Sequence, residues 1–175
     1  MKEYFDKAFT KVAVLGSGTM GGQIAAHFAN LGFDTTMFDT SEEALSKSIA
    51  MMKKLKPTPF ASPTVSGLIK TSTYDDLTVI SECDFIIESI VENLDIKKKL
   101  FKQISPYVND NAILVTNTSG LSIQKIAESA PDNLRSRIFG VHFFNPPRYL
   151  PLVELIRTSY SDESLLIRAE GFITS

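Results

Sequence analysis

Three glycines in one short segment are the first residues whose spacing suggests chemistry. The segment Gly16-Ser17-Gly18-Thr19-Met20-Gly21 follows an apolar run and precedes a stretch of helical periodicity. In such a strand-to-helix turn, the first glycine allows the bend, the second lets the backbone approach a phosphate, and the third lets helix and strand pack closely. The N–H groups that begin the helix attract phosphate oxygens. The turn therefore predicts a dinucleotide site formed by Gly16, Gly18, Thr19, Met20 and Gly21.

Asp39 suggests which dinucleotide binds. It ends the second apolar run, where a carboxylate accepts hydrogen bonds from the ribose hydroxyls of the adenosine half. A 2′-phosphate at that place would meet a like charge, so NAD is favoured over NADP as the cofactor. The alternative is that the glycines serve an ordinary turn and that Asp39 only solubilises a strand end.

His142 and Glu154 are the second set of residues that suit catalysis. His142 lies among bulky apolar residues in the segment Val141-His142-Phe143-Phe144-Asn145-Pro146-Pro147, and Glu154 lies in the next apolar run. If the chain reverses through the prolines, the carboxylate can orient and charge-stabilise the imidazole, as a general base requires. A lone histidine at a strand end is more often structural, but a neighbouring dinucleotide site reverses that preference. His27, at the edge of an apolar helix face, is expected to be structural.

Short apolar runs rich in β-branched residues alternate with helix-periodic stretches, which is the pattern of βαβ units. Strands are predicted at 11–15, 35–38, 68–72, 85–90, 112–116, 137–142 and 152–156. Helices are predicted at 19–31, from a cap at Ser41 to about 55, at 94–104 and 122–128, and from 162 onward. Residues 1–175 are therefore predicted to be a single α/β domain with a doubly wound, mostly parallel sheet of Rossmann type.

Composition excludes several classes of protein. The formal net charge of −2 leaves no basic excess for a nucleic acid. No window approaches the roughly 18 consecutive apolar residues of a membrane span. The single cysteine, Cys83, cannot form an internal disulfide, and residues 1–10 are charged instead of apolar, which favours a cytoplasmic protein over a secreted one. No metal site is expected.

Four motifs, taken in order, resemble those of the L-3-hydroxyacyl-CoA dehydrogenases. They are the glycine turn, Glu88-Ser89-Ile90-Val91-Glu92-Asn93, Thr116-Asn117-Thr118-Ser119 and His142-Phe143-Phe144-Asn145-Pro146. The resemblance runs from about Lys11 to Thr158, and its last motif is the most diagnostic. It implies that the chain is the NAD-binding half of an enzyme that oxidises an L-3-hydroxyacyl-CoA to the 3-ketoacyl-CoA in fatty-acid β-oxidation.

The resemblance also implies roles for single residues. His142 matches the family's general base, Glu154 its charge partner, and Ser119 the serine that hydrogen-bonds the substrate oxygen. Asn117 and Glu92 match residues near the nicotinamide end of the cofactor. Two alternatives stay open, because Ser119 and Asn117 are also residue types that cap a following helix, and Glu92 is a type that precedes one.

Two departures from the family pattern bear on activity. The helical hairpin that helps the family to hold coenzyme A is shortened in residues 46–70, where Lys53, Lys54 and Lys56 either meet CoA phosphates or form a solvated face. We expect the chain to lack the family's C-terminal helical domain. We therefore expect it to be inactive alone and its parent to be a homo-oligomer or a multidomain protein. Two other functions stay open: a stand-alone NAD-binding module, and a related dehydrogenase that acts on a free hydroxy acid.

Overall fold

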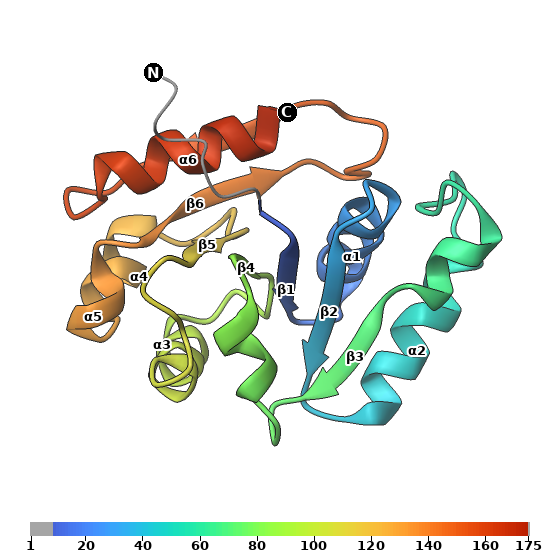
Figure 1. Ribbon diagram of the computed structural model, residues 1–175, viewed down its shortest axis with the longest axis horizontal. Helices are drawn as coiled ribbons and strands as arrows, with labels where there is room; N and C mark the ends of the chain where they lie inside the picture. Colours follow the sequence, from blue (N-terminus) through green and yellow to red (C-terminus); the bar gives the residue numbers. More distant parts are fainter. Residues whose placement is uncertain (1–8, 175) are drawn as a thin grey trace.

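A computed structural model describes residues 9–174, which form a seven-stranded sheet with helices on both faces (Figure 1). The strand order is β3-β2-β1-β4-β5-β6-β7, and every neighbouring pair is parallel except β6 with β7. The strands are β1 (Lys11–Leu15), β2 (Asp34–Asp39), β3 (Lys70–Thr73), β4 (Phe85–Glu88), β5 (Ile113–Thr116), β6 (Ile138–Phe143) and β7 (Val153–Ile156). The predicted doubly wound, mostly parallel α/β sheet is confirmed.

Both faces of the sheet are apolar, because successive side chains of a strand point to opposite faces and both sets are buried. In β1, Val12 and Val14 pack under α1, α2, η2 and α6, whereas Ala13 and Leu15 pack under η3, α3, α4 and α5. The helices are α1 (Thr19–Asn30), α2 (Glu42–Met52), η2 (Pro63–Gly67), η3 (Thr78–Glu82), α3 (Leu94–Ile104), α4 (Ile123–Ser129), α5 (Asp132–Arg135) and α6 (Glu163–Thr174).

The starts of the helices follow from their capping residues. Ser41 caps α2, Asn93 caps α3 and Ser122 caps α4, each with a side-chain oxygen that accepts a backbone N–H of the first turn. Helix α1 differs, because its N-cap is Gly18, which has no side chain to accept these N–H groups. The start of α1 is therefore suited to an acceptor that comes from outside the helix.

A few local predictions were wrong. The helix predicted at 19–31 ends at Asn30, and Leu31 is 61% exposed, because the chain turns at Gly32 with positive φ. The helix after Ser41 ends at Met52, before position 55. The short segments η2, η3 and α5 were not predicted, since a single turn leaves too few residues for a periodic signal.

The order of the strands creates a crevice at their carboxyl ends. Strand β1 lies between β2 and β4, and the helices that follow β1 and β4 cover opposite faces of the sheet. Two backbone hydrogen bonds tie the loops at this point: Gly16 N–H donates to the Phe38 carbonyl at 2.8 Å, and Ser89 N–H donates to the Leu15 carbonyl at 2.7 Å. Ligands of open α/β sheets bind at the carboxyl ends of two such neighbouring strands, where the chain connections leave in opposite directions.

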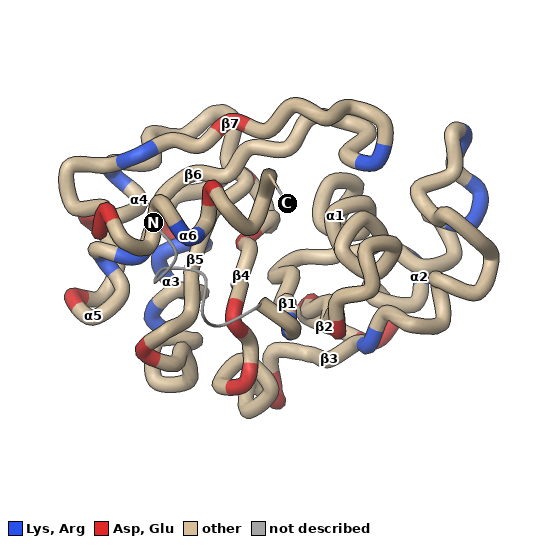
Figure 2. Tube along the Cα trace, turned by 45° about the horizontal axis from the view of Figure 1, so that its top comes forward, with Lys and Arg blue, Asp and Glu red and all other residues tan. Residues whose placement is uncertain are grey.

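Charged residues of both signs are spread along residues 9–174 without a large cluster of one sign (Figure 2). The connection that follows α2 carries the exposed side chains of Lys53, Lys54 and Lys56. Their contact with coenzyme A stays a prediction. Within the described part of the chain, none of the helices has the length and apolar character that a membrane span needs.

Candidate functional site

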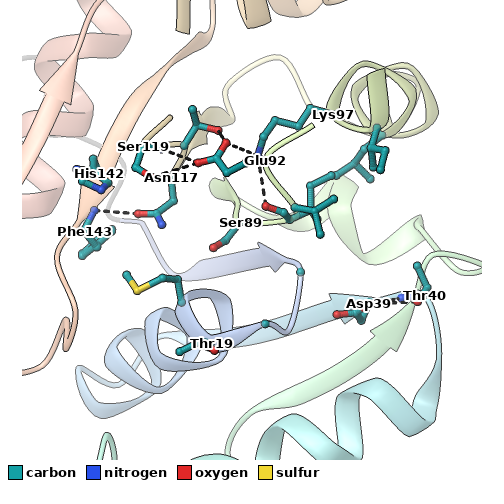
Figure 3. A pocket seen from close by; sticks show the side chains of 18 of the residues that line it. Thr19, Asp39, Thr40, Ser89, Glu92, Lys97, Asn117, Ser119, His142 and Phe143 are labelled. Atoms are coloured by element: carbon teal, nitrogen blue, oxygen red, sulfur yellow. Dashed lines mark hydrogen bonds and ion pairs between the residues drawn. The ribbon is translucent and has the colours of Figure 1, made fainter. Parts of the chain in front are cut away.

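A cavity of about 880 Å³ opens at the carboxyl ends of the parallel strands (Figure 3). Its volume lies in the range of small-molecule and cofactor sites. All the predicted site residues except Gly21 and Glu154 line it, namely Gly16, Gly18, Thr19, Met20, Asp39, Glu92, Asn117, Ser119 and His142. The structure thus brings together two sets of residues that are far apart in the sequence, the glycine turn and the strand end that carries the histidine.

Two of the three glycines are required by the fold itself. Gly16 has a φ of +104°, and a Cβ there would lie 2.6 Å from the Ser89 carbonyl oxygen. A Cβ on Gly21 would lie 1.9 Å from the Gly16 carbonyl oxygen. A Cβ on Gly18 would meet nothing within 4 Å. Gly18 therefore serves no packing purpose within the protein, and the open space beside it belongs to the cavity.

The start of α1 suits a negatively charged group. The helix has no acidic residue in its first turn and no side-chain cap, and Thr19 and Met20 line the cavity. The aligned peptide dipoles place a partial positive charge at a helix N-terminus. Together with the open space at Gly18, this arrangement fits the pyrophosphate of a dinucleotide.

Asp39 places a negative charge at the end of β2, on the wall of the same cavity. One carboxylate oxygen accepts the N–H and the hydroxyl of Ser17 at 2.7 and 2.5 Å, and the other accepts the N–H and the hydroxyl of Thr40 at 2.7 and 3.2 Å. Burial raises the pKa of Asp39, but these hydrogen bonds outweigh it and hold the pKa below its ordinary value. Asp39 is therefore an anion at neutral pH.

His142 and Glu154 contact each other across β6 and β7. The antiparallel register places the two residues directly opposite, and His142 Nδ1 lies 2.9 Å from a Glu154 carboxylate oxygen. The histidine side chain is 19% exposed and the glutamate side chain 53%. Because Nδ1 is engaged, Nε2 is the nitrogen that can exchange a proton with a ligand.

Glu92 binds the turn that follows β5 (Figure 3). Its carboxylate accepts the backbone N–H of Ser119 at 2.7 Å, that of Gly120 at 3.3 Å and the hydroxyls of Thr118 and Ser119 at 3.0 and 3.3 Å. Burial raises the pKa of Glu92, but these hydrogen bonds and the nearby Lys97 charge leave it below its ordinary value. Glu92 thus fixes the turn that carries Ser119.

Asn117 ties three strands together instead of capping a helix. Its backbone N–H donates to the Glu88 carbonyl at 2.8 Å, and its side-chain oxygen accepts the N–H of Phe143 at 2.8 Å. The N-cap of the following helix is Ser122. The alternative that Asn117 or Ser119 caps that helix is therefore wrong.

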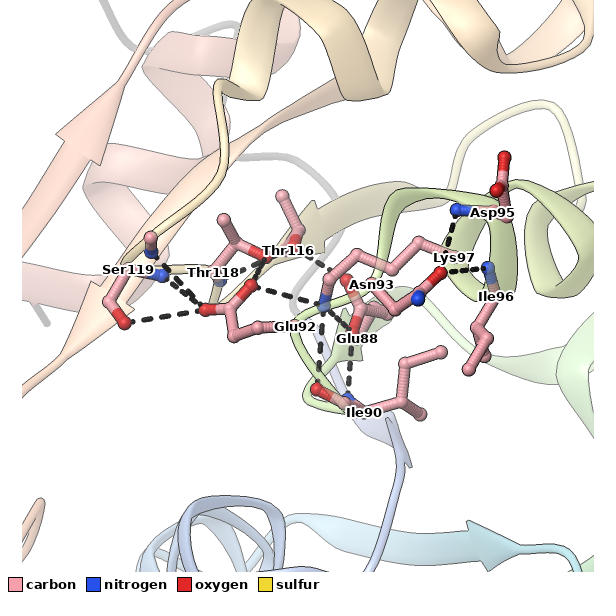
Figure 4. A network of polar contacts seen from close by, with 11 residues as sticks. Glu88, Ile90, Glu92, Asn93, Asp95, Ile96, Lys97, Thr116, Thr118 and Ser119 are labelled. Carbon is pink, nitrogen blue, oxygen red and sulfur yellow. Dashed lines mark hydrogen bonds and ion pairs between the residues drawn. The ribbon is translucent and has the colours of Figure 1, made fainter.

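Lys97, which lines the cavity, forms a buried ion pair with Glu88 (Figure 4). The Lys97 amino group donates to a Glu88 oxygen at 2.5 Å, and the side chains are 1% and 0% exposed. Glu88 also accepts the N–H of Ile90 at 2.7 Å and the hydroxyl of Thr116 at 2.6 Å. This pair was not predicted from the sequence, although the helical spacing of Lys97 from the apolar Leu100 is a usable signal of burial.

Two titratable groups, His27 and Cys83, do not line this cavity. His27 is half-buried beside the rings of Phe28 and Phe143, and burial lowers its pKa, which agrees with a structural role. Burial raises the pKa of the Cys83 thiol to about 12, so the thiol is unreactive. Among residues 9–174, no three His, Cys, Asp or Glu side chains gather as a metal site would require.

Comparison with known proteins gives a consistent result. Residues 11–175 match the protein family described as "3-hydroxyacyl-CoA dehydrogenase, NAD binding domain". A putative fatty acid oxidation complex trifunctional enzyme of Rickettsia felis is 40% identical over 172 residues, which cover 94% of this chain and 24% of the relative. A probable 3-hydroxyacyl-CoA dehydrogenase of Bacillus subtilis is 38% identical, covering 91% of this chain and 23% of the relative.

The fold also matches solved structures. The crystal structure of (S)-3-hydroxybutyryl-CoA dehydrogenase from Ralstonia eutropha superposes with a TM-score of 0.81 at 34% sequence identity, covering 95% of this chain and 60% of that one. The chain thus spans about a quarter of the two curated relatives and three fifths of this structure.

Proposed function

The chain belongs to the family of NAD-binding domains of 3-hydroxyacyl-CoA dehydrogenases, and from this premise we propose that the protein oxidises the 3-hydroxyl group of an L-3-hydroxyacyl-CoA to a ketone. The observation that carries the proposal is the position of His142, which is paired with Glu154 and faces the cavity that the glycine turn also lines. NAD is the cofactor. When bound, it supplies the acceptor for the hydride that leaves carbon 3 of the substrate.

The residues that would hold NAD line the cavity from the Asp39 end to the His142 end. The N–H groups at the start of α1 would hold the pyrophosphate, and Asp39 the ribose of the adenosine half. Glu92 and Asn117 lie on the far side of the sheet's crevice, beside His142, and would meet the nicotinamide half. Because Asp39 is an anion, it would repel a 2′-phosphate. Calorimetric titration of the chain is expected to give tighter binding of NAD than of NADP, and equal or tighter binding of NADP would rule out this assignment.

The residues of this chain handle the proton of the reaction. The Glu154 carboxylate holds the N–H at Nδ1 of His142, which leaves Nε2 to accept the 3-hydroxyl proton of the substrate. The same carboxylate stabilises the imidazolium that results. Ser119 would donate to the substrate oxygen, because its hydroxyl makes only a long hydrogen bond of 3.3 Å to Glu92 and can turn to a closer acceptor.

Several finer points belong to the same proposal. The relatives named above support an acyl-CoA substrate and a place in fatty-acid β-oxidation. Those relatives are much longer than the part matched here, so we also propose that residues 1–175 alone bind NAD but turn over substrate poorly. A cytoplasmic location stays a prediction, as do the domain's extent over residues 1–175 and its assembly into an oligomer or a multidomain protein.

The test is the formation of NADH by the protein that contains these residues, as the unaltered protein and with His142→Gln. The expected result is oxidation of (S)-3-hydroxybutyryl-CoA and a loss of about 100-fold or more in kcat for the variant, since a positioned base contributes at least that much. Turnover of the variant within a few-fold of the unaltered protein would eliminate His142 as the base. A preference for free 3-hydroxybutyrate would point to a hydroxy-acid dehydrogenase, and NAD binding without turnover of either substrate would point to a binding module.

A further inference from the structure

The side chain of Gln23 connects α1 to the loop that follows β6. It is 5% exposed, and its Nε2 atom donates to the Thr19 carbonyl oxygen and to Oδ1 of Asn145, both at 3.0 Å. Asn145 lies three positions beyond His142 and lines the main cavity. Gln23 does not line the cavity itself. It therefore contacts the site through Asn145.

These two hydrogen bonds determine the orientation of the Gln23 and Asn145 side-chain amides. A backbone carbonyl such as that of Thr19 can only accept, so the Gln23 atom beside it must be the NH₂ group. The second hydrogen of that NH₂ group points to Asn145, so the Asn145 atom that receives it must be the carbonyl oxygen. If the Asn145 amide were rotated by half a turn, its NH₂ group would face the NH₂ group of Gln23, and both groups are donors.

The Asn145 amide consequently has one free end, and that end is a donor. Its oxygen accepts the hydrogen bond from Gln23, and its Nδ2 atom donates to no acceptor among residues 9–174. Asn145 is an exposed residue of the cavity wall. The NH₂ group of Asn145 is thus available to an acceptor atom of a ligand in the cavity.

The strand order indicates which part of the ligand Asn145 meets. Asp39 ends β2, and Asn145 follows β6, so β1, β4 and β5 separate them. Asn145 therefore lies at the His142 end of the cavity, far from the end that Asp39 assigns to adenosine.

We propose that Gln23 is a positioning residue that turns the Asn145 amide so that its NH₂ group donates to the nicotinamide riboside half of the cofactor. This inference rests on the proposed function, because it takes the direction of NAD in the cavity from Asp39 and His142. Gln23, which lies outside the cavity, thus determines that Asn145 presents a donor to the ligand instead of an acceptor.

The test is calorimetric titration of residues 1–175 with NAD and with ADP, which lacks the nicotinamide riboside half. Gln23→Met removes the donor at similar side-chain length, and we expect it to weaken NAD binding about fivefold, the size of one hydrogen bond, with ADP binding unchanged. Gln23→Glu replaces the donor by an acceptor, so the Asn145 amide should turn its NH₂ group inward. That variant should lose more NAD affinity than Gln23→Met. Gln124→Met, at a half-buried glutamine outside the cavity, is the matched control.

A double-mutant cycle separates positioning from a general structural effect. In an Asn145→Ala background, Gln23→Met should cause no further loss of NAD affinity, because the group that it positions is gone. Full additivity of the two losses would overturn the inference, as would equal weakening of NAD and ADP or unchanged NAD binding by Gln23→Met. Failure of the unaltered chain to bind NAD at all would instead overturn the proposed function. Circular dichroism of each variant checks that it folds.

Discussion

The Glu154 carboxylate lies 2.9 Å from His142 Nδ1 because the antiparallel register of β6 and β7 places the two residues directly opposite each other. The pairing is therefore set by the backbone and holds the imidazole without a ligand. Strand β7 is the only antiparallel strand in the described sheet, and it lies at the edge. Its contribution to the site is to bring a carboxylate beside the end of β6.

The first prediction concerns this carboxylate. Glu154→Gln keeps a side chain of the same shape but removes the charge that stabilises a protonated imidazole. We expect kcat of the protein that contains these residues to fall about 100-fold, the low end of what positioned proton transfer contributes, with little change in KM. Glu163→Gln, an exposed glutamate in a surface ion pair with Arg157, is the control and should stay within twofold. A kcat for Glu154→Gln as high as that of this control would show that Glu154 has no part in catalysis.

The second prediction separates two kinds of glycine. Gly21→Ala places a Cβ 1.9 Å from the Gly16 carbonyl and should lower the free energy of unfolding by about 1–3 kcal/mol or more. Gly18→Ala places a Cβ in open space and should cost less than about 1 kcal/mol, yet weaken NAD binding strongly. Urea unfolding and calorimetry measure the two effects. If Gly18→Ala binds NAD as well as the unaltered chain, the pyrophosphate does not lie against this turn.

The glycine turn and the His142 pair were predictable because both depend on local pattern. An apolar run, a glycine turn and a helical period define the first, and the proline-rich reversal that follows His142 brings the next apolar run alongside β6. Lys97 shows what local pattern leaves out. It is one of three consecutive lysines, and its burial depends on Glu88, which stands on another element and makes the charge tolerable inside the protein. The contact of Gln23 with Asn145 depends in the same way on the packing of α1 against the end of β6.

The third prediction concerns the buried pair. Lys97→Met leaves the Glu88 carboxylate buried without a counter-charge, which typically costs about 3–5 kcal/mol of stability. Adding Glu88→Gln should restore part of the loss, because an amide can still accept the Ile90 N–H and donate to the Thr116 hydroxyl. Lys98→Met, at the exposed neighbouring position, should change stability by less than about 0.5 kcal/mol. Urea unfolding of the four proteins measures this, and similar stabilities for Lys97→Met and Lys98→Met would contradict the prediction.

The fourth prediction is a pH dependence of stability at Asp39. Its pKa in the folded chain lies below the ordinary value of 3.8, so ionisation of Asp39 stabilises the folded state relative to the unfolded state. That contribution is fully present above about pH 4 and is lost as the pH falls through the lower folded-state pKa. The unaltered chain should therefore be more stable than Asp39→Asn near neutral pH, and the difference should shrink in acid. Urea unfolding at several pH values tests this, and a difference that does not change with pH would show that the charge contributes nothing.

The most direct test of the central claim is a crystal structure of residues 1–175 with NAD bound. The pyrophosphate is expected against the start of α1 at Gly18, the adenosine ribose beside Asp39, and the nicotinamide ring beside Nε2 of His142, with the Glu154 contact to Nδ1 retained. A nicotinamide ring that lies away from His142, or NAD bound outside this cavity, would contradict the account.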